Sequence, residues 1–325
     1  MGKENVIITK SRNKNLNVFV ILFLIILLVY SISLVIPLIW GFITSFKHKQ
    51  DFFVNKVGLP NFSIWSKYAA VDPDYSNVLG NYTVVLANFN LEFSASYFVG
   101  IFTQTKVSHS VNATIWTCFY NTFLYCAGCT ILPTFMNLLV GYLCAKYRYK
   151  FSTLVYGFVV FTMVMPIVGT MPAMITLLRQ IGFYDEFYGH WIRQAAFGGT
   201  NFLIFYGFYT GLSDTYIEAA EIDGASQLRV IISIVIPLAK TTITTLMLLA
   251  FITAWNDYNT PLIYLPTKPT LSYGIFHLTQ KAATKLQEPP IIVASLMLLA
   301  IPIIIVFVTL RNKLMGNVSL GGIKE

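Results

Sequence analysis

Six long blocks of apolar residues divide this chain and decide what it can fold into. They span about residues 18–43, 115–144, 154–178, 195–212, 242–255 and 291–310. Of the 325 residues, 56% are hydrophobic and only 11% are charged, whereas a soluble domain carries roughly 25% charged residues. Because lipid cannot hydrogen-bond the backbone, such blocks form helices that cross the bilayer. The sequence therefore predicts an all-α integral membrane protein with about six transmembrane helices.

The charged residues predict how the chain is oriented. An even number of spans puts both termini on one side of the membrane, and the basic N-terminal tail and the short basic loop 146–150 place that side in the cytoplasm. The run from Val18 to Trp40 is longer than the roughly 7–15 residues of a signal-peptide core, so we interpret it as a retained membrane helix. The net charge of +8 is scattered over the block ends and forms no basic stripe for nucleic acid.

These boundaries divide the chain into four regions. Residues 1–45 are a cytoplasmic tail and the first transmembrane helix, 46–110 an extracytoplasmic connector, 111–312 the core membrane domain, and 313–325 a cytoplasmic C-terminal tail. The connector is rich in aromatic residues and asparagine, and either a small folded cap or an extended segment fits its composition.

Metal and catalytic chemistry find little support in the sequence. The four histidines, at positions 48, 109, 190 and 277, are far apart in connecting segments. Cys126 and Cys129 have C-x-x-C spacing, but no second pair or nearby histidine accompanies them, so small packing residues in a helix are the simpler interpretation. We predict no metal site and no catalytic residue.

The most informative segment is the predicted cytoplasmic loop 214–238. Thr215 and Glu218 have the spacing of a capping box, which predicts the start of a short helix. Gly224 can adopt the positive φ that ends a helix. A second helix then follows, and Pro237 turns the chain into the next span.

The second helix of the loop has an apolar stripe. Five residues fall at i, i+3, i+4, i+7 and i+8, namely Leu228, Ile231, Ile232, Val235 and Ile236. This spacing predicts one buried face, with the helix lying along the membrane interface.

The first helix of the loop has a different character. Its two carboxylates, Glu218 and Glu221, flank the small residues Ala219 and Ala220. Small residues let another backbone approach closely, and an exposed carboxylate pairs well with a guanidinium. This pattern is typical of a docking surface.

Together these residues resemble a known family. Glu218-Ala-Ala, Asp223-Gly-Ala and Ile236-Pro-Leu resemble the EAA loop of ABC-importer permeases, and the chain is similar to carbohydrate permeases of the maltose-transporter type, in particular the smaller six-span subunit. Further similar stretches are Asn121-Thr122, Gly141 to Lys146, Met165-Pro166 and Gly316 to Glu325. The chain departs from the family in its longer outer segment and in ending on Glu325 instead of glycine.

The resemblance implies a fold, partners and residue roles. It implies a type I ABC-importer permease fold in a bacterial plasma (inner) membrane, working with a second permease subunit, an ABC ATPase dimer and an extracytoplasmic sugar-binding protein. It assigns ATPase coupling to Glu218, Ala219, Ala220, Asp223 and Gly224, and a weaker tail contact to Gly321, Gly322 and Lys324. The chain would form half of a pathway for a sugar or oligosaccharide.

A substrate pathway is a separate hypothesis. Trp255, Asn256 and Tyr258 end the fifth block on its outer side, and they combine aromatic faces with amide groups that suit sugar rings and hydroxyls. Asn121, near the start of the second block, is the fourth candidate. An interfacial aromatic anchor is the competing interpretation of this group.

Two other classes of membrane protein remain as alternatives. An ion-coupled secondary carrier of a small polar solute would usually hold charged residues within its spans, and no Asp, Glu, Lys or Arg lies in the middle of the six blocks. A membrane enzyme would need a motif such as H-E-x-x-H or G-x-S-x-G, which the sequence lacks. No phosphate loop is present either. We therefore expect no cofactor on this chain, with ATP and Mg²⁺ bound by a separate ATPase subunit.

Overall fold

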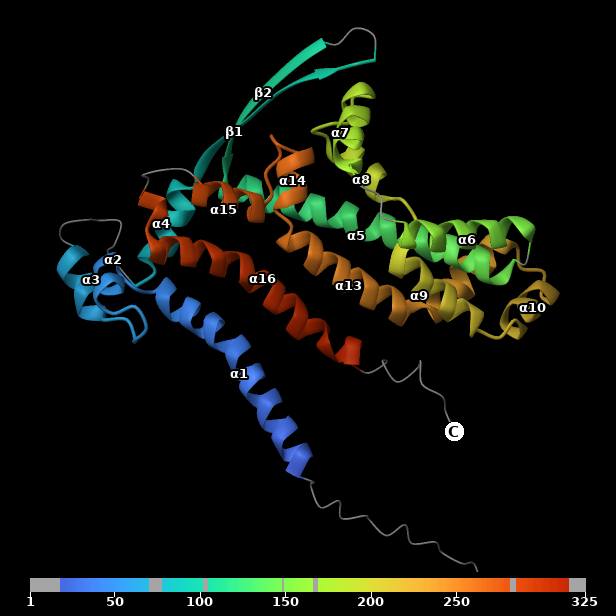
Figure 1. Cartoon of the computed structure of the whole chain (residues 1–325), viewed down its shortest axis with the longest axis horizontal. Coiled ribbons are helices and arrows are strands. Elements are labelled where there is room, and N and C mark those ends of the chain that lie inside the picture. Colours follow the sequence, from blue (N-terminus) through green and yellow to red (C-terminus); the bar gives the residue numbers. More distant parts are fainter. Residues whose placement is uncertain are drawn as a thin grey trace, which may run out of the picture.

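The structure is a computed structural model, which describes residues 18–69, 78–101, 105–147, 149–165, 169–280 and 285–315. It is mostly helical, with one β-hairpin (Figure 1). The elements are α1 (Val18–Ser45), α2 (Lys49–Val54), α3 (Phe62–Ala69), α4 (Gly80–Asn88), β1 (Asn90–Val99), β2 (Thr105–Thr114), α5 (Ile115–Lys146), α6 (Lys150–Val164), α7 (Thr170–Gln180), α8 (Phe187–Gln194), α9 (Gly199–Thr210), α10 (Thr215–Ile222), α11 (Gln227–Val230), the π-helical η2 (Ile231–Val235), α12 (Ile236–Leu238), α13 (Lys240–Asn256), α14 (Asn259–Tyr264), α15 (Leu271–Gln280), the 3-10 turn η3 (Lys285–Gln287) and α16 (Pro289–Met315).

All six apolar blocks contain helices, but the helices differ in length. Within the described residues, three helices are long and apolar enough to cross a membrane alone, namely α1, α5 and α16. A fourth span is formed if α11–α12 and α13, which meet at a bend of 72°, count as one. Helices α6 and α9 have 15 and 12 residues, about 18–23 Å at 1.5 Å per residue, which is shorter than the roughly 30 Å hydrocarbon core.

The expected single span over residues 154–178 is wrong. Helix α6 ends at Val164, and a separate helix, α7, begins at Thr170. Gly169, the N-cap residue of α7, has φ of +80°, a left-handed conformation that a continuous helix cannot contain. Pro166, which lies in this break, is outside the described residues.

The outer segment is folded. It contains α2, α3 and α4, followed by an antiparallel hairpin in which Asn90 pairs with Thr114 and Val99 with Thr105. Strand β2 continues to Thr114, the N-cap residue of α5, so the hairpin joins the second apolar block without a linker. The all-α expectation therefore describes the membrane part, and the outer part adds a small sheet.

Alternating side chains fix the hairpin to the helices. Along β1, Leu91, Phe93 and Tyr97 are buried, while the intervening residues are exposed or half-buried, as expected for a half-covered strand. Phe93 contacts Tyr273 of α15 edge-to-face at 5.1 Å, and Tyr97 contacts Tyr184 at 4.7 Å. The hairpin is thus packed against α15 and against the connection between α7 and α8.

Helix α5 is the spine of the molecule. The hairpin, α4 and α15 gather around its N-terminal end, and α10 lies beyond its C-terminal end (Figure 1). Two glycines allow close neighbours, since a Cβ at Gly128 would lie 2.1 Å from the Trp191 ring and one at Gly141 would lie 2.9 Å from Cβ of Phe205. Helices α8 and α9 can therefore approach α5 closely, and one helix connects the two ends of the molecule.

Candidate functional site

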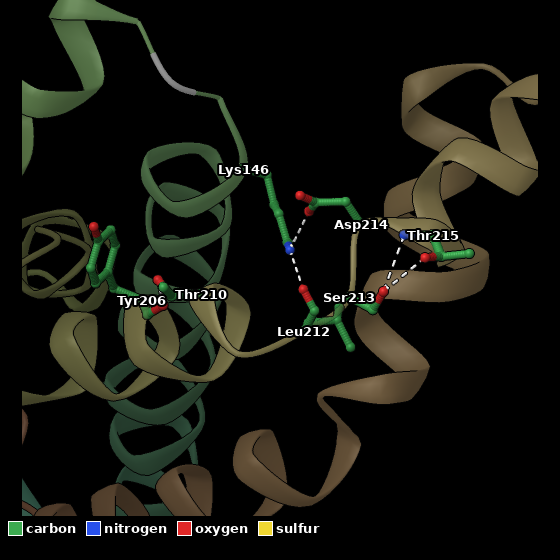
Figure 2. A network of polar contacts seen from close by, with 7 residues as sticks. All are labelled: Lys146, Tyr206, Thr210, Leu212, Ser213, Asp214 and Thr215. Atoms are coloured by element: carbon green, nitrogen blue, oxygen red, sulfur yellow. Dashed lines mark hydrogen bonds and ion pairs between the residues drawn. The ribbon is translucent and has the colours of Figure 1, made fainter.

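The loop between α9 and α13 begins with helix α10. This helix starts at Thr215, with Asp214 as the N-cap residue and no side-chain cap. The expected capping box of Thr215 and Glu218 is therefore not formed. Instead, the Ser213 hydroxyl accepts a 3.3 Å hydrogen bond from the Thr215 N–H, as Figure 2 shows. A hydroxyl two residues before the helix thus satisfies the first N–H group of α10.

The C-terminal end of α10 agrees with the expectation from Gly224. Its φ is +75°, the Gly224 N–H donates to the Glu221 carbonyl, and the Ala225 N–H donates to the Ala220 carbonyl at 2.9 Å. These two bonds form a Schellman motif. A Cβ at position 224 would meet nothing within 4 Å, so the positive φ alone favours glycine there. Asp223, the C-cap residue, is exposed.

Helix α10 has one face against the protein and one face in the open. Ile217 and Ala220 are half-buried and pack against a core that includes Tyr142 and Val230. On the opposite side, Glu218, Ala219 and Ile222 are exposed, and we call these three residues the docking face. Ile222 is 85% exposed, so the docking face carries an apolar side chain beside the Glu218 carboxylate.

The two acidic residues of α10 have different surroundings. Glu221 accepts a 2.6 Å hydrogen bond from the Gln227 amide, whose oxygen accepts one from the Tyr147 hydroxyl. Among the described residues, the Glu218 carboxylate has no hydrogen bond or ion pair. Glu221 therefore holds the loop together, whereas Glu218 points outward and is free to bind a cation.

The second helix of the loop is continuous through α11, η2 and α12, and the expected stripe is only partly buried. Ile231, Val235 and Ile236 pack against the core as expected. Val230 and Val235 are fully buried, whereas Leu228 and Ile232 are 72% and 64% exposed. The π-helical turn explains the difference, because its wider winding puts residues five apart on one face. The helix meets α13 at 72°, a sharp turn consistent with a helix that lies along an interface.

Lys146, at the end of α5, holds the start of the loop. Its ammonium group lies 2.6 Å from a carboxylate oxygen of Asp214 and also donates to the Leu212 carbonyl (Figure 2). Only 8% of the Lys146 side chain is exposed. Sequence reasoning missed this contact because the partners are 66 and 68 residues away.

Two of the four pathway candidates are packed inside the protein. The Trp255 ring is fully buried, and its N–H donates to the Leu299 carbonyl at 3.0 Å. The Asn121 amide is 8% exposed and donates to the Pro269 carbonyl at 3.1 Å. These contacts satisfy both polar groups within the protein.

The other two candidates are exposed. The Asn256 amide bonds the Ile252 carbonyl of its own helix, and the Tyr258 ring stacks on Phe276 at 4.5 Å. The structure therefore does not bring the four candidates into one site, and a pathway role for Asn256 and Tyr258 stays a prediction.

A polar cavity lies next to these residues. It measures about 320 Å³ and opens between α5, α8, α9 and α13. Its polar lining comprises Tyr125, Gln194, Asn201, Thr253 and Asp257, and apolar residues such as Leu246 and Leu249 complete it. The Tyr125 hydroxyl donates to Asp257 at 2.9 Å. The sequence offered a signal for this cavity, because Asn201, Thr253 and Asp257 are polar residues within or beside apolar blocks.

Two further expectations concern the tail and metals. Gly321, Gly322 and Lys324 lie outside the described residues. In the part of the chain that the structure describes, no group of three or more His, Cys, Asp or Glu residues could hold a metal ion.

The fold and the loop thus define a multi-pass membrane protein with an exposed helical docking face at one end of its spine. Comparison with known proteins identifies the class. The chain belongs to the family of binding-protein-dependent transport system inner membrane components, whose model matches residues 137–316. This range contains the cavity-lining helices from α8 onward and the whole loop 214–238. The chain is therefore a permease component of a transport system.

Its curated relatives are permeases too. The chain is 27% identical over 210 residues to the sn-glycerol-3-phosphate transport system permease protein UgpE of Escherichia coli K12, a match that covers 64% of this chain and 74% of the relative. The UgpE protein of Salmonella typhimurium LT2 is 27% identical over 211 residues, with the same coverage.

A solved structure shares the fold. It is a chain from a bacterial ABC transporter involved in the import of the acidic polysaccharide alginate, and its TM-score is 0.71 at 21% identity. The match covers 94% of this chain and 99% of the other. The folded outer segment therefore lies largely within the shared architecture.

Proposed function

We propose that this chain is one permease subunit of an ATP-driven, binding-protein-dependent importer of a sugar-like solute. ATP and Mg²⁺ would bind to a separate ATPase dimer, and a second permease subunit would complete the pathway. The observation that carries the proposal is the docking face, an exposed carboxylate beside a small residue and an exposed isoleucine, held at the end of the spine helix. An ATPase that presents a guanidinium in a cleft would fit this surface.

The orientation follows from the same arrangement. With both termini and the docking face in the cytoplasm, the basic loop 146–150 is also inside, as the positive-inside rule requires. The hairpin gathers at the opposite end of α5, where an extracytoplasmic binding protein would deliver the solute. Labelling a cysteine placed at position 218 from each side of the membrane tests this orientation, and reaction only from outside would contradict it.

The cavity supports a particular class of solute. Its polar groups are amides, hydroxyls and the Asp257 carboxylate, and the described residues that line it include no Lys or Arg. A carboxylate in a site of low dielectric repels an anion, whereas hydroxyl groups can bond both amides and carboxylates. We therefore propose a neutral, hydroxyl-rich solute. This choice differs from the phosphate ester and the acidic polysaccharide named for the relatives.

The function is tested by reversing the charge of the docking face. In the complete complex, Glu218→Arg should leave membrane insertion unchanged but lower both uptake and binding-protein-stimulated ATP hydrolysis by tenfold or more, because losing one partner of a buried charge pair costs about 2–5 kcal/mol. Lys150→Glu is the matched control, since Lys150 is exposed and has no ion pair within the described residues. Normal coupling in the Glu218→Arg complex would leave the loop as a mere connector.

A further inference from the structure

Two neighbouring residues at the C-terminal end of α5 hold both sides of the coupling helix α10. On the side before α10, the Lys146 ammonium group bonds Asp214 and the Leu212 carbonyl. On the side after α10, the Tyr147 hydroxyl donates to Gln227, and the Gln227 amide donates to Glu221 at 2.6 Å. The segment that carries the docking face is thus bonded on both sides to the C-terminal end of α5.

The contacts of Lys146 with Asp214 and the Leu212 carbonyl are placed where they can hold α10 against α5. The Lys146 side chain is 8% exposed and that of Asp214 is 61% exposed, so the ion pair is half-exposed, and the bond to the Leu212 carbonyl is the more buried of the two contacts. The positive charge of Lys146 also lies at the C-terminal end of a 32-residue helix, where the helix dipole favours a cation. Breaking the contact would leave the Leu212 carbonyl and the ammonium group without these partners, which is costly for buried polar groups.

Helix α5, which carries Lys146 at its C-terminal end, also lines the cavity. Tyr125 and Cys129 of α5 line it, and they lie 21 and 17 residues before Lys146 in the same helix. Helix α9 is joined to this unit, because Asn137 accepts a 2.8 Å hydrogen bond from the Gly198 N–H just before α9 begins and Tyr142 packs edge-to-face on Tyr209 at 5.4 Å. A displacement of α10 is therefore passed to helices that line the cavity.

We propose that Lys146 and Tyr147 are positioning residues that transmit the movement of α10 into α5, so that the C-terminal end of α5 is the mechanical mount of the coupling helix. This inference rests on the proposed function, since it supposes that an ATPase moves α10. It goes beyond that function by naming the route, which runs through the pair Lys146–Asp214 and the relay Tyr147–Gln227–Glu221 into the spine helix. In this scheme Glu218 binds the ATPase, and Lys146 and Tyr147 transmit the movement of α10 to α5.

The test compares transport with ATP hydrolysis in proteoliposomes that hold the complete complex with its cognate ATPase and binding protein. In Lys146→Met, the solute carried per ATP hydrolysed should fall about five- to tenfold, the equivalent of losing one charged hydrogen bond and a half-exposed ion pair, while ATP hydrolysis continues. Lys150→Met is the matched control. It removes the same charge, but from an exposed side chain that lies four residues after Lys146. Tyr147→Phe should have a smaller effect in the same direction, and Tyr149→Phe should have none.

Rescue separates positioning from simple misfolding. The double variant Lys146→Glu, Asp214→Lys restores opposite charges and should recover part of the coupling that Lys146→Glu alone loses. Hydrogen exchange of residues 212–227 in the assembled complex should be faster in Lys146→Met and should return toward the wild-type rate in the double variant. Equal membrane insertion and assembly of all variants would exclude misfolding, and coupling that stays as low in the double variant as in Lys146→Glu would overturn the role of the pair.

The outcomes distinguish this inference from the proposed function. If Lys146→Met couples as the wild type does while Glu218→Arg abolishes coupling, the mount is wrong and the function stands. If neither variant changes coupling, the proposed function itself fails. If Lys146→Met and Lys150→Met lose coupling equally, the effect is one of net charge, and the mount is again overturned.

Discussion

At the scale of single residues, Gly224 shows a requirement that the sequence reveals and the structure explains. A glycine after a short helix predicted a positive φ, and the observed value is +75°. Lys146 shows the opposite case. Its role depends on residues 66 and 68 positions away, and no local spacing rule can find such a contact. Local conformation could be predicted here, whereas the partners across space could not.

Gly224 provides the first prediction at this scale. Gly224→Val should destabilise the turn by about 1–3 kcal/mol, because a β-branched residue is strained in the left-handed region, and coupling should fall as α10 is misdirected. Gly224→Asn should be nearly neutral, since asparagine tolerates this region. The measurement is coupled ATP hydrolysis by the complete complex. Gly157→Ala is the control, because an added Cβ at this position in α6 would meet nothing within 4 Å. Equal losses in Gly157→Ala and Gly224→Val would refute the backbone argument.

The cavity provides the second prediction at this scale. Asn201→Leu or Thr253→Val removes polar groups from the lining, so the KM for a neutral sugar should rise about tenfold, as expected when roughly 1–1.5 kcal/mol of hydrogen bonding is lost. ATP hydrolysis should persist. Uptake kinetics in proteoliposomes provide the measurement. A loss confined to Asn256→Ala and Tyr258→Ala would instead favour the pathway inferred from sequence.

At the scale of elements, the helices of the membrane part could be predicted and several of their details could not. The apolar blocks located α1, α5, α6, α9, α13 and α16, because lipid demands a satisfied backbone. The break near Gly169 and the π-helical η2 were missed, since hydropathy measures apolar content and not winding. The hairpin did leave a signal, as Leu91, Phe93, Ala95 and Tyr97 alternate with polar residues. A period of two is the pattern of a half-buried strand.

The connection between two outer loops provides a prediction at this scale. Asp185, before α8, is buried and accepts hydrogen bonds from the N–H and hydroxyl of Thr267, before α15. Burial raises the pKa of Asp185 above its usual value, although the bonds from Thr267 and the charge of Lys268 oppose the shift. Because the folded pKa is raised, the stabilisation is fully present below the unfolded pKa and is lost as the pH rises through the folded pKa.

Asp185→Asn should remove this component of the pH dependence. The variant keeps a neutral side chain that tolerates the φ of +63° at this position, so its unfolding temperature should decline less than that of the wild type between about pH 4 and about pH 7. Thermal unfolding in detergent over this range is the measurement. Glu92→Gln, on the exposed face of the hairpin, is the control, and a Glu92→Gln curve that flattens as much as that of Asp185→Asn would count against a local effect.

At the scale of the whole molecule, one spine helix connects the β-hairpin, a polar cavity and the docking face of α10. Helix α5 begins where the hairpin ends, lines the cavity at Tyr125 and ends at the contact of Lys146 with Asp214. This order gives a simple account of the proposed coupling, in which movement at the docking face would reach the cavity through one continuous helix. The sequence indicated the class of transporter, and the structure supplied the connection between its ends.

The most direct test of this account is uptake of a radiolabelled neutral sugar by proteoliposomes, with this chain alone compared with the complete complex. Because an ATP-driven permease subunit has no energy source of its own, the chain alone should carry no sugar under any imposed proton or sodium gradient. The complete complex should accumulate sugar only when ATP is present on the ATPase side. Gradient-driven uptake by the chain alone would contradict the account and would identify an ion-coupled carrier instead.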